Sequence, residues 1–174
     1  LHVITRSQKN SGSQNINSGE FESRIKEIVQ NLNLVTISGD RQIVKTQKGV
    51  GEPLVAKVYL LKDGSQTPVS NIPVIFNYEA GQGELEQEKS SGSDGTVQTT
   101  IHKISSYEEA NHMISVKLDY SRIRSNFNGD YVENLLSPLK NKRATFNYAI
   151  QTPKWPSNKS QAWRESITDL SNQL

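Results

Sequence analysis

The sequence predicts an all-β fold, an antiparallel β-sandwich, with a short helix towards each end of the chain. Between residues 53 and 101, short apolar runs alternate with gaps that contain Gly, Pro, Asn, Asp or Ser. Such runs are typical of strands, and such gaps are typical of turns. Within several runs apolar and polar residues alternate, which is the pattern of a strand with one buried face.

The composition argues against several kinds of partner and chemistry. The 174 residues carry 20 basic and 18 acidic side chains and a formal charge of +2, so no field of one sign favours nucleic acid or a membrane surface. No apolar run approaches the roughly 20 residues of a membrane-spanning helix. The chain has no cysteine, which excludes disulfides, thiolate chemistry and sulfur-ligated zinc. The predicted sandwich is therefore held by packing, and its polar composition favours an envelope or surface module.

Residues 1–31 are expected to form a strand, a polar loop and a short amphipathic helix. The helix is predicted to start at Ser18, a residue type favoured at helix N-caps. Its apolar side chains recur at helical spacing in Phe21, Ile25, Ile28 and Leu32. One strand and one helix cannot bury their own faces, so this extension either packs on the sandwich or ends a preceding α+β domain. We predict the second arrangement.

Residues 32–150 are predicted to form the sandwich. Its strands are expected in the segments 31–39, 42–52 (a short strand or a linker), 53–62, 72–85, 96–104, 113–120 and 144–151. The residues that alternate onto the predicted core face include Leu54, Ala56, Val58, Val74, Phe76, Tyr78, Ile114, Val116, Leu118, Phe146 and Tyr148.

Turn residues and one acidic run add detail to this domain. Residues 62–64, Lys-Asp-Gly, are expected to close a turn, and Gly81 and Gly83 to permit a bulge or kink. Glu84, Glu86 and Glu88 recur at every second residue, so all three are expected to point out of one strand face. We interpret them as a solvated face, because their spacing lacks the ligand order of a calcium loop.

Residues 121–143 form a polar insertion between the last two predicted strands. Residues 131–139 are expected to form about two helical turns that Pro138 would tend to end. Long insertions of this kind often carry function, so we predict an interaction site here. Its candidate residues are two aromatic and four basic side chains: Phe127, Tyr131, Arg122, Arg124, Lys140 and Arg143.

Residues 151–174 are predicted to be a proline-bounded linker followed by an amphipathic helix. Trp163, Ile167, Leu170 and Leu174 recur at helical spacing behind Ser160 as a cap. We interpret this helix as the start of a following domain. Docking back on the sandwich is the alternative.

Several short motifs in the centre of the chain resemble a known family. They are the segments 53–58 (PLVAKV), 68–76 (PVSNIPVIF), 81–85 (GQGEL) and 91–97 (SGSDGTV). Together they resemble the bacterial Ig-like domains of the invasin and intimin group, over roughly residues 37–120. The resemblance implies an Ig-like sandwich of Greek-key topology without catalytic activity. Ser93 stands where that family usually has Thr, and the insertion after Tyr120 is longer than the family pattern.

The flanking segments resemble small α+β domains of bacterial envelope lipoproteins of the flagellar-associated and curli-secretion type. This resemblance implies a fragment of a multidomain envelope lipoprotein, extracytoplasmic in the periplasm or at the cell surface. It also implies a lipid anchor outside the present sequence.

The residues give no catalytic or cofactor signature. The histidines are His2, His102 and His112, and no nucleophile elbow of the G-x-S-x-G type is present. We expect each histidine to be exposed and non-catalytic. We therefore predict no enzyme activity, no cofactor and no metal.

Two functions from different classes stay open. The first is a structural or protein-interaction module, a spacer or docking domain, which meets another envelope protein or a neighbouring domain of the same chain. It would use its sheet edges or the 121–143 insertion. The second is a glycan-binding accessory domain that uses Phe127 and Tyr131.

Overall fold

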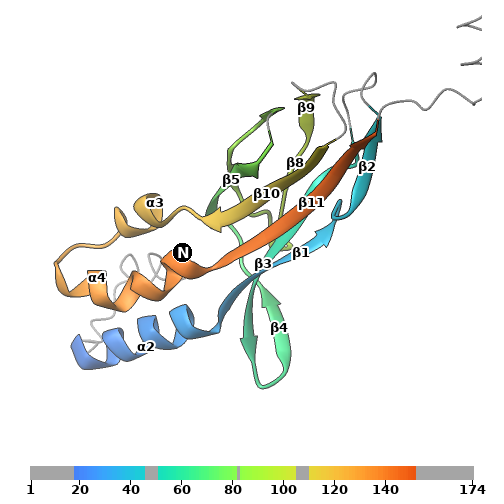
Figure 1. Cartoon of the computed structure of the whole chain (residues 1–174). Helices are drawn as coiled ribbons and strands as arrows, with labels where there is room; N and C mark the ends of the chain where they lie inside the picture. The colour runs from blue at the N-terminus through green and yellow to red at the C-terminus, as the bar shows by residue number, and fades with distance from the viewer. Residues whose placement is uncertain (1–17, 46–50, 82, 105–109, 152–174) are drawn as a thin grey trace, which may run out of the picture.

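The computed structural model describes residues 18–45, 51–81, 83–104 and 110–151. Figure 1 shows two layers of strands, with helices gathered at one end and the short strands β2 and β9 towards the other. We call these the helical end and the distal end. The predicted C-terminal helix and the strand expected at the start of the chain lie outside the described residues.

The first sheet is built around β3. The strand order is β1-β3-β4, and β8 also pairs with β3. All three partners run antiparallel to β3. The bounds are β1 Leu32–Ser38, β3 Leu54–Lys62, β4 Ser65–Pro68 and β8 Thr96–Thr99.

The second sheet has five strands in the order β2-β11-β10-β5-β7. Its pairs are antiparallel except for β2 with β11, which are parallel. A separate two-stranded sheet joins β6 to β9. The bounds are β2 Gln42–Lys45, β5 Pro73–Ala80, β6 Gly83–Leu85, β7 Glu88–Ser90, β9 Ile101–Ile104, β10 Ala110–Leu118 and β11 Arg143–Gln151.

This strand order is that of an Ig-like sandwich. The first strand region is split between the layers, with β1 pairing β3 in one sheet and β2 pairing the last strand, β11, in the other. The strands β11, β10 and β5 are neighbours in one layer, whereas β3 and β8 pair in the other. Hairpins alone cannot produce such neighbours, so the connections cross between the layers as in a Greek key. The predicted fold class is confirmed.

The chain crosses between the sheets through Gly39, Asp40 and Arg41. Gly39 has a φ of +86°, and a Cβ there would collide with the carbonyl oxygen of Pro53. The Arg41 amide donates to the Asn147 carbonyl at 2.6 Å, and the Asn147 amide donates to Asp40 Oδ1 at 2.7 Å. These bonds hold β2 at the outer edge of β11.

The core lies between the two main sheets. Leu54, Ala56 and Val58 of β3 are at 0% exposure, as are Phe76 of β5 and Phe146 of β11. The rings of Phe76 and Phe146 stack with their centroids 6.3 Å apart. The alternation read from the sequence therefore assigns the buried face of these strands correctly.

The turn predicted at residues 62–64 is confirmed, but the strand after it was missed. Asp63 and Gly64 both have positive φ, 50° and 77°, as in the tight turns that favour Asp-Gly. The turn leads directly into β4, which pairs with the end of β3. All four β4 residues are exposed, so β4 lacks the apolar alternation that marks a strand in sequence.

The prediction that Glu84, Glu86 and Glu88 share one strand face is wrong. All three are exposed, but Glu84 lies in β6 and Glu88 in β7, which belong to different sheets. The chain changes sheets between them: the carbonyl of Glu86 accepts from Thr99 Oγ1 at 2.9 Å, and that of Gln87 accepts from the Phe76 amide at 2.8 Å.

Helices cover the helical end of the sandwich. The helix α2, Ser18–Asn31, runs directly into β1, and its Ile25 and Val29 are 2% and 3% exposed within the common core. The helix therefore packs on the sandwich. The assignment of residues 1–31 to the end of a preceding domain stays a prediction.

Candidate functional site

The 121–143 insertion is a folded cap rather than an open loop. It contains α3 (Tyr120–Arg124), α4 (Tyr131–Leu136) and the 3-10 helix η2 (Ser137–Asn141). The predicted helical turns before and around Pro138 are confirmed by α4 and η2; α3 was missed. Ile123, Val132, Leu136 and Leu139 are buried, so these helices share the core of the sandwich.

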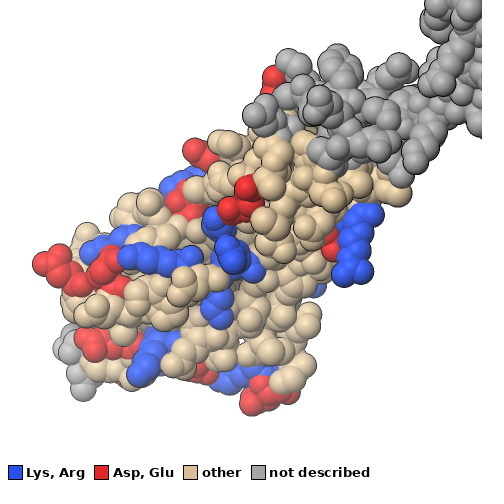
Figure 2. Space-filling model, in the orientation of Figure 1, with Lys and Arg blue, Asp and Glu red and all other residues tan. Residues whose placement is uncertain are grey.

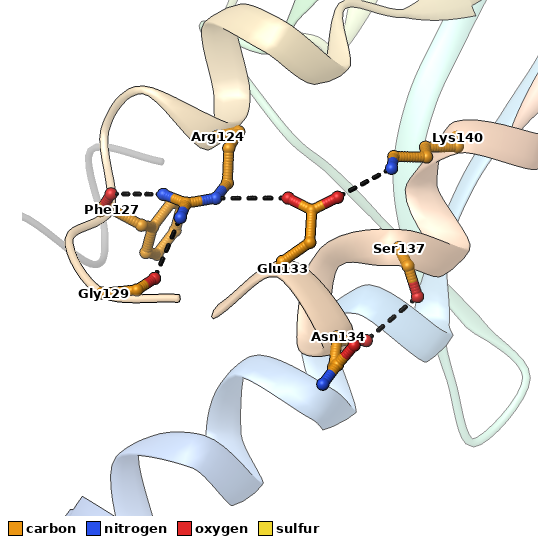
Figure 3. A network of polar contacts seen from close by, with 7 residues as sticks. All are labelled: Arg124, Phe127, Gly129, Glu133, Asn134, Ser137 and Lys140. Carbon is orange, nitrogen blue, oxygen red and sulfur yellow. Dashed lines mark hydrogen bonds and ion pairs between the residues drawn. The ribbon is translucent and has the colours of Figure 1, made fainter. Parts of the chain in front are cut away.

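Arg124 forms hydrogen bonds with the segment between α3 and α4. Its Nη1 donates to the Phe127 carbonyl at 2.6 Å and its Nη2 to the Gly129 carbonyl at 2.9 Å. Its Nε lies 3.4 Å from Glu133 Oε2 on α4. Figure 3 shows the guanidinium between these three groups. A planar donor fork suits such a set of acceptors, and it leaves Arg124 engaged within its own cap.

Lys140 is also engaged within the cap. Its Nζ lies 2.7 Å from Glu133 Oε1 and 4.5 Å from the ring centroid of Tyr120. The hydrogen bond from Lys140 lowers the pKa of Glu133, and the same bond raises the pKa of Lys140. Glu133 thus accepts a hydrogen bond from Lys140 and forms an ion pair with Arg124, so both cations have a carboxylate partner within the cap.

Arg122 and Arg143 are exposed at different places. Arg122 Nη1 lies 3.8 Å from Glu88 Oε2, and its Nε lies 3.9 Å from Asp119, whose carboxylate caps α3 by accepting from the Arg122 amide. Arg143 is the first residue of β11 and lies opposite Lys117 of β10. The Nζ of Lys117 is 2.6 Å from Glu79. Figure 2 shows basic and acidic side chains side by side over the helical end.

The two predicted aromatic residues do not share one exposed face. Phe127 is half-buried against the core, whereas Tyr131 is 50% exposed. That these residues of the 121–143 insertion form an interaction site stays a prediction. The structure shows that Arg124 and Lys140 have partners within the cap and that Phe127 serves partly as packing.

An uncharged patch lies at the distal end, on the outer face of the five-stranded sheet. We call it the distal patch, and its members are Ile43, Asn111, Met113, Asn147 and Ala149. Ile43 is 60% and Met113 36% exposed. The register places Ile43 and Asn111 on either side of Ala149, and Met113 opposite Asn147. In Figure 2 the described surface near β2 is tan, with a basic side chain at its lower border.

The distal patch adjoins a sheet edge that no strand of the described residues covers. Among the described residues β2 pairs only with β11, so its other edge has no strand partner. The opposite edge of the same sheet is β7, Glu-Lys-Ser, with charged side chains of the kind that discourage strand pairing. A shallow recess of about 420 Å³ beside the patch is lined by Arg41, Gln42, Asn111 and Asn147, among others.

Sequence reasoning missed this patch. Residues 42–52 were expected to be a short strand or a linker, and this expectation did not assign Ile43 to either face of a sheet. The alternation of β10 did contain a signal, because Met113 falls on the same side as Ser115 and Lys117. A single apolar residue on an outer face is common, so Met113 alone did not predict the patch.

The expectation that His112 is exposed is wrong. It is 2% exposed, its ring stacks on Tyr148 at 4.8 Å and meets the edge of Tyr78 at 6.3 Å. Neither ring nitrogen has a hydrogen-bond partner among the described residues, and burial lowers the pKa of His112. The side chain continues the inward alternation of Ile114 and Val116. His102 is exposed, and His2 lies outside the described residues.

The two rings that contact His112 are those of tyrosines whose hydroxyls lie close to each other. The hydroxyls of Tyr78 and Tyr148 lie 3.2 Å apart, and burial raises the pKa of both. Within the described ranges, no group of three His, Cys, Asp or Glu residues is placed to hold a metal ion. None of the helices described there is both long enough and apolar enough to cross a bilayer.

The fold and this surface define an Ig-like β-sandwich domain with a helical cap. No protein-family model and no curated protein matches the chain. Solved structures with a similar chain course include the D0-D1 domain of intimin, with a TM-score of 0.37 and 13% identity over 68% of this chain and 45% of that one. Another is the D00-D0 domain of intimin, with a TM-score of 0.34 and 20% identity over 49% and 38%.

A third is the M1 domain from titin, with a TM-score of 0.29 and 12% identity over 70% of this chain and 98% of that one. The chain spans less than half the length of either intimin structure. These likenesses are distant, so the assignment to the Ig-like fold rests on the strand order described above.

Proposed function

We propose that this chain is a non-catalytic structural or protein-interaction module of an extracytoplasmic bacterial protein. It acts as a spacer or docking domain, and it meets its partner through the distal patch and the open edge of β2. The partner is another envelope protein or a neighbouring domain of the same polypeptide.

The distal patch is the observation that supports this proposal. Ile43 and Met113 are large apolar side chains exposed on one sheet face, with amide groups between them and no charge among the five members. Charged residues are depleted at the centre of protein interfaces, and Met is enriched there. An open strand edge beside such a patch adds backbone hydrogen-bond donors and acceptors that a partner strand can pair with.

The cell-envelope location is part of the proposal. It is supported by the cysteine-free, polar composition and by the sequence motifs that resemble bacterial Ig-like domains. The group of bacterial Ig-like domains that those motifs resemble includes intimin, which two of the similar structures name. The proposal also includes a lipid anchor, carried by another part of the protein.

A site-specific photocrosslinker in the full chain, expressed in its native host, tests the proposed surface. We expect the crosslinker at Ile43 or Met113 to give one discrete adduct, either to a second protein or within the chain. Ile37 and Leu61, which are 55% and 40% exposed outside the distal patch, are the matched control positions. Equal adducts at all four positions, or none at Ile43 and Met113, would contradict the proposal.

The glycan-binding alternative has a separate test. Tyr131→Ala and Phe127→Ala would each reduce retention on peptidoglycan or an immobilised glycan if these rings bound sugar. We expect one of two results: the parent chain is not retained at all, or both variants are retained as well as the parent chain. Because the half-buried Phe127 also packs against the core, Tyr131→Ala is the decisive variant of the two.

A further inference from the structure

An apolar cavity of about 340 Å³ lies at the helical end, between α2, the end of β4 with the segment after it, and the 121–143 cap. This is the end of the molecule opposite the distal patch (Figure 1). Ile28 and Val29 line it from α2, Val69 from the segment after β4, and Ile123 and Phe127 from the cap.

The chemistry of the cavity wall is uniform. Every lining residue is apolar except Thr67 and Ser70, and none is charged. No hydrogen bond of either hydroxyl is found among the described residues. Thr67 and the adjacent Pro68 are exposed, so the cavity opens to solvent beside β4, where these hydroxyls lie.

Each of the three walls is also held by contacts outside the cavity. Ser91 fixes the segment after β4, because its hydroxyl donates to the Val69 carbonyl at 2.7 Å and accepts from the Ile72 amide at 3.0 Å. Arg124 closes the cap, as described above. The helix α2 continues into β1 without a linker. These contacts fix the local shape of each wall.

Protein interiors are close-packed, and a preformed apolar cavity tends to stay dry and take up apolar molecules. The volume falls within the range of ligand pockets. We propose that this cavity binds a small neutral amphiphile, with its hydrocarbon body among α2, Val69 and the cap and one hydroxyl or carbonyl at Thr67 and Ser70. The wall contains no basic side chain that could pair with an anionic head group, so a neutral head group is favoured.

Fluorescence titration of the 174-residue chain with N-phenyl-1-naphthylamine, a neutral apolar fluorophore, tests the site. We expect saturable binding of one molecule per chain. Thr67→Trp places an indole at the opening and is expected to weaken binding about tenfold or more. Gln66→Trp is the matched control, because Gln66 is the neighbouring exposed residue of β4 but does not line the cavity.

Competition defines the ligand class. Decanol is expected to displace the fluorophore at a concentration about tenfold below that needed with decanoate at neutral pH. Circular dichroism and thermal unfolding of both tryptophan variants establish that each is folded. Three results would overturn the inference: no saturable binding to the parent chain, equal weakening in the two variants, or equal competition by decanol and decanoate. The test does not involve the distal patch, so its outcome is separate from that of the proposed function.

Discussion

At the scale of single residues, His112 and Gly81 show how the distal end of the core is closed. His112 stacks on Tyr148 and meets Tyr78 edge-on, and no other described residue forms a hydrogen bond with either ring nitrogen. Gly81 lies against the imidazole, and a Cβ at this position would overlap it. The imidazole therefore acts as a neutral flat ring that fills space, and the glycine is needed to let it fit.

His112 makes the stability of the fold depend on pH. Burial lowers its pKa in the folded chain below the ordinary value of 6.5, so the unfolded chain binds the proton more readily. The stabilisation is complete above pH 6.5 and is lost as the pH falls below that value. We expect His112→Phe to reduce the slope of the free energy of unfolding against pH, below pH 6.5, by up to about 1.4 kcal/mol per pH unit.

Urea unfolding at pH values between 5 and 7.5 measures this effect. His102→Phe is the control, because His102 is exposed. An unchanged acid slope in His112→Phe would contradict the assignment.

Gly81→Ala is expected to destabilise the fold more than Gly64→Ala. Both glycines have positive φ, +89° and +77°, but nothing lies within 4 Å of a Cβ built at Gly64. Gly64→Ala should therefore cost only the backbone strain, about 1–2 kcal/mol. Gly81→Ala adds the collision with His112, which we expect to raise the cost by at least about 1 kcal/mol. Chemical denaturation measures both, and equal losses would show that the imidazole moves aside freely.

At the scale of elements, the cap depends on one arginine more than on its other basic residues. Arg124 bonds two carbonyls of the segment that joins α3 to α4 and also contacts Glu133. Arg122 is exposed, and its two nearest carboxylate contacts are long. The two residues look equivalent in sequence, yet only one of them holds the turn.

We expect Arg124→Ala to lower the free energy of unfolding by about 1–3 kcal/mol, because two carbonyls lose a charged donor. Arg122→Ala should change it by no more than about 0.5 kcal/mol, as for other exposed ion pairs. Urea denaturation followed by circular dichroism compares the two variants. A loss at Arg122 as large as that at Arg124 would contradict the structural role given to Arg124.

At the scale of the whole molecule, α2 and the cap share one core with the two sheets. Ile25 and Val29 of α2 and Leu136 and Leu139 of the cap are as buried as residues of the strands. Further bonds link the elements at the surface: Lys62 Nζ lies 2.6 Å from Glu27 of α2, and Lys142 Nζ donates to the Gln30 carbonyl at 3.5 Å. The helices and the sandwich should therefore unfold together.

Ile25→Ala tests this cooperativity. We expect it to lower the free energy of unfolding by about 2–5 kcal/mol, the usual cost of truncating a buried isoleucine. The transition should stay single when helix is followed at 222 nm and tyrosine environment by fluorescence. Ile43→Ala, at an exposed position, is the control. Two separate transitions in the parent chain would show that α2 is an independent unit.

The sequence by itself determined the strands β3, β5, β10 and β11, their buried faces and the turn after β3. It missed β4 and β7, and it predicted residues 72–85 and 96–104 as single strands where the structure has two strands in different sheets. Alternation along β3, β5, β10 and β11 is a local property, because successive side chains of a strand point to opposite faces. The Asp63-Gly64 turn and the helical turns near Pro138 are likewise set by backbone preferences of a few neighbouring residues. These parts of the prediction needed no knowledge of which strand lies beside which.

Only the tertiary structure decided how distant segments meet. Pairing of β2 with β11 exposes Ile43 beside Met113, and the switch between Glu86 and Gln87 divides the acidic run between two sheets. The same holds for the partners of Arg124, the burial of His112 and the cavity beneath the cap. Each arises from contacts between residues far apart in the chain, which form when two sheets close around one core, and no local periodicity encodes them.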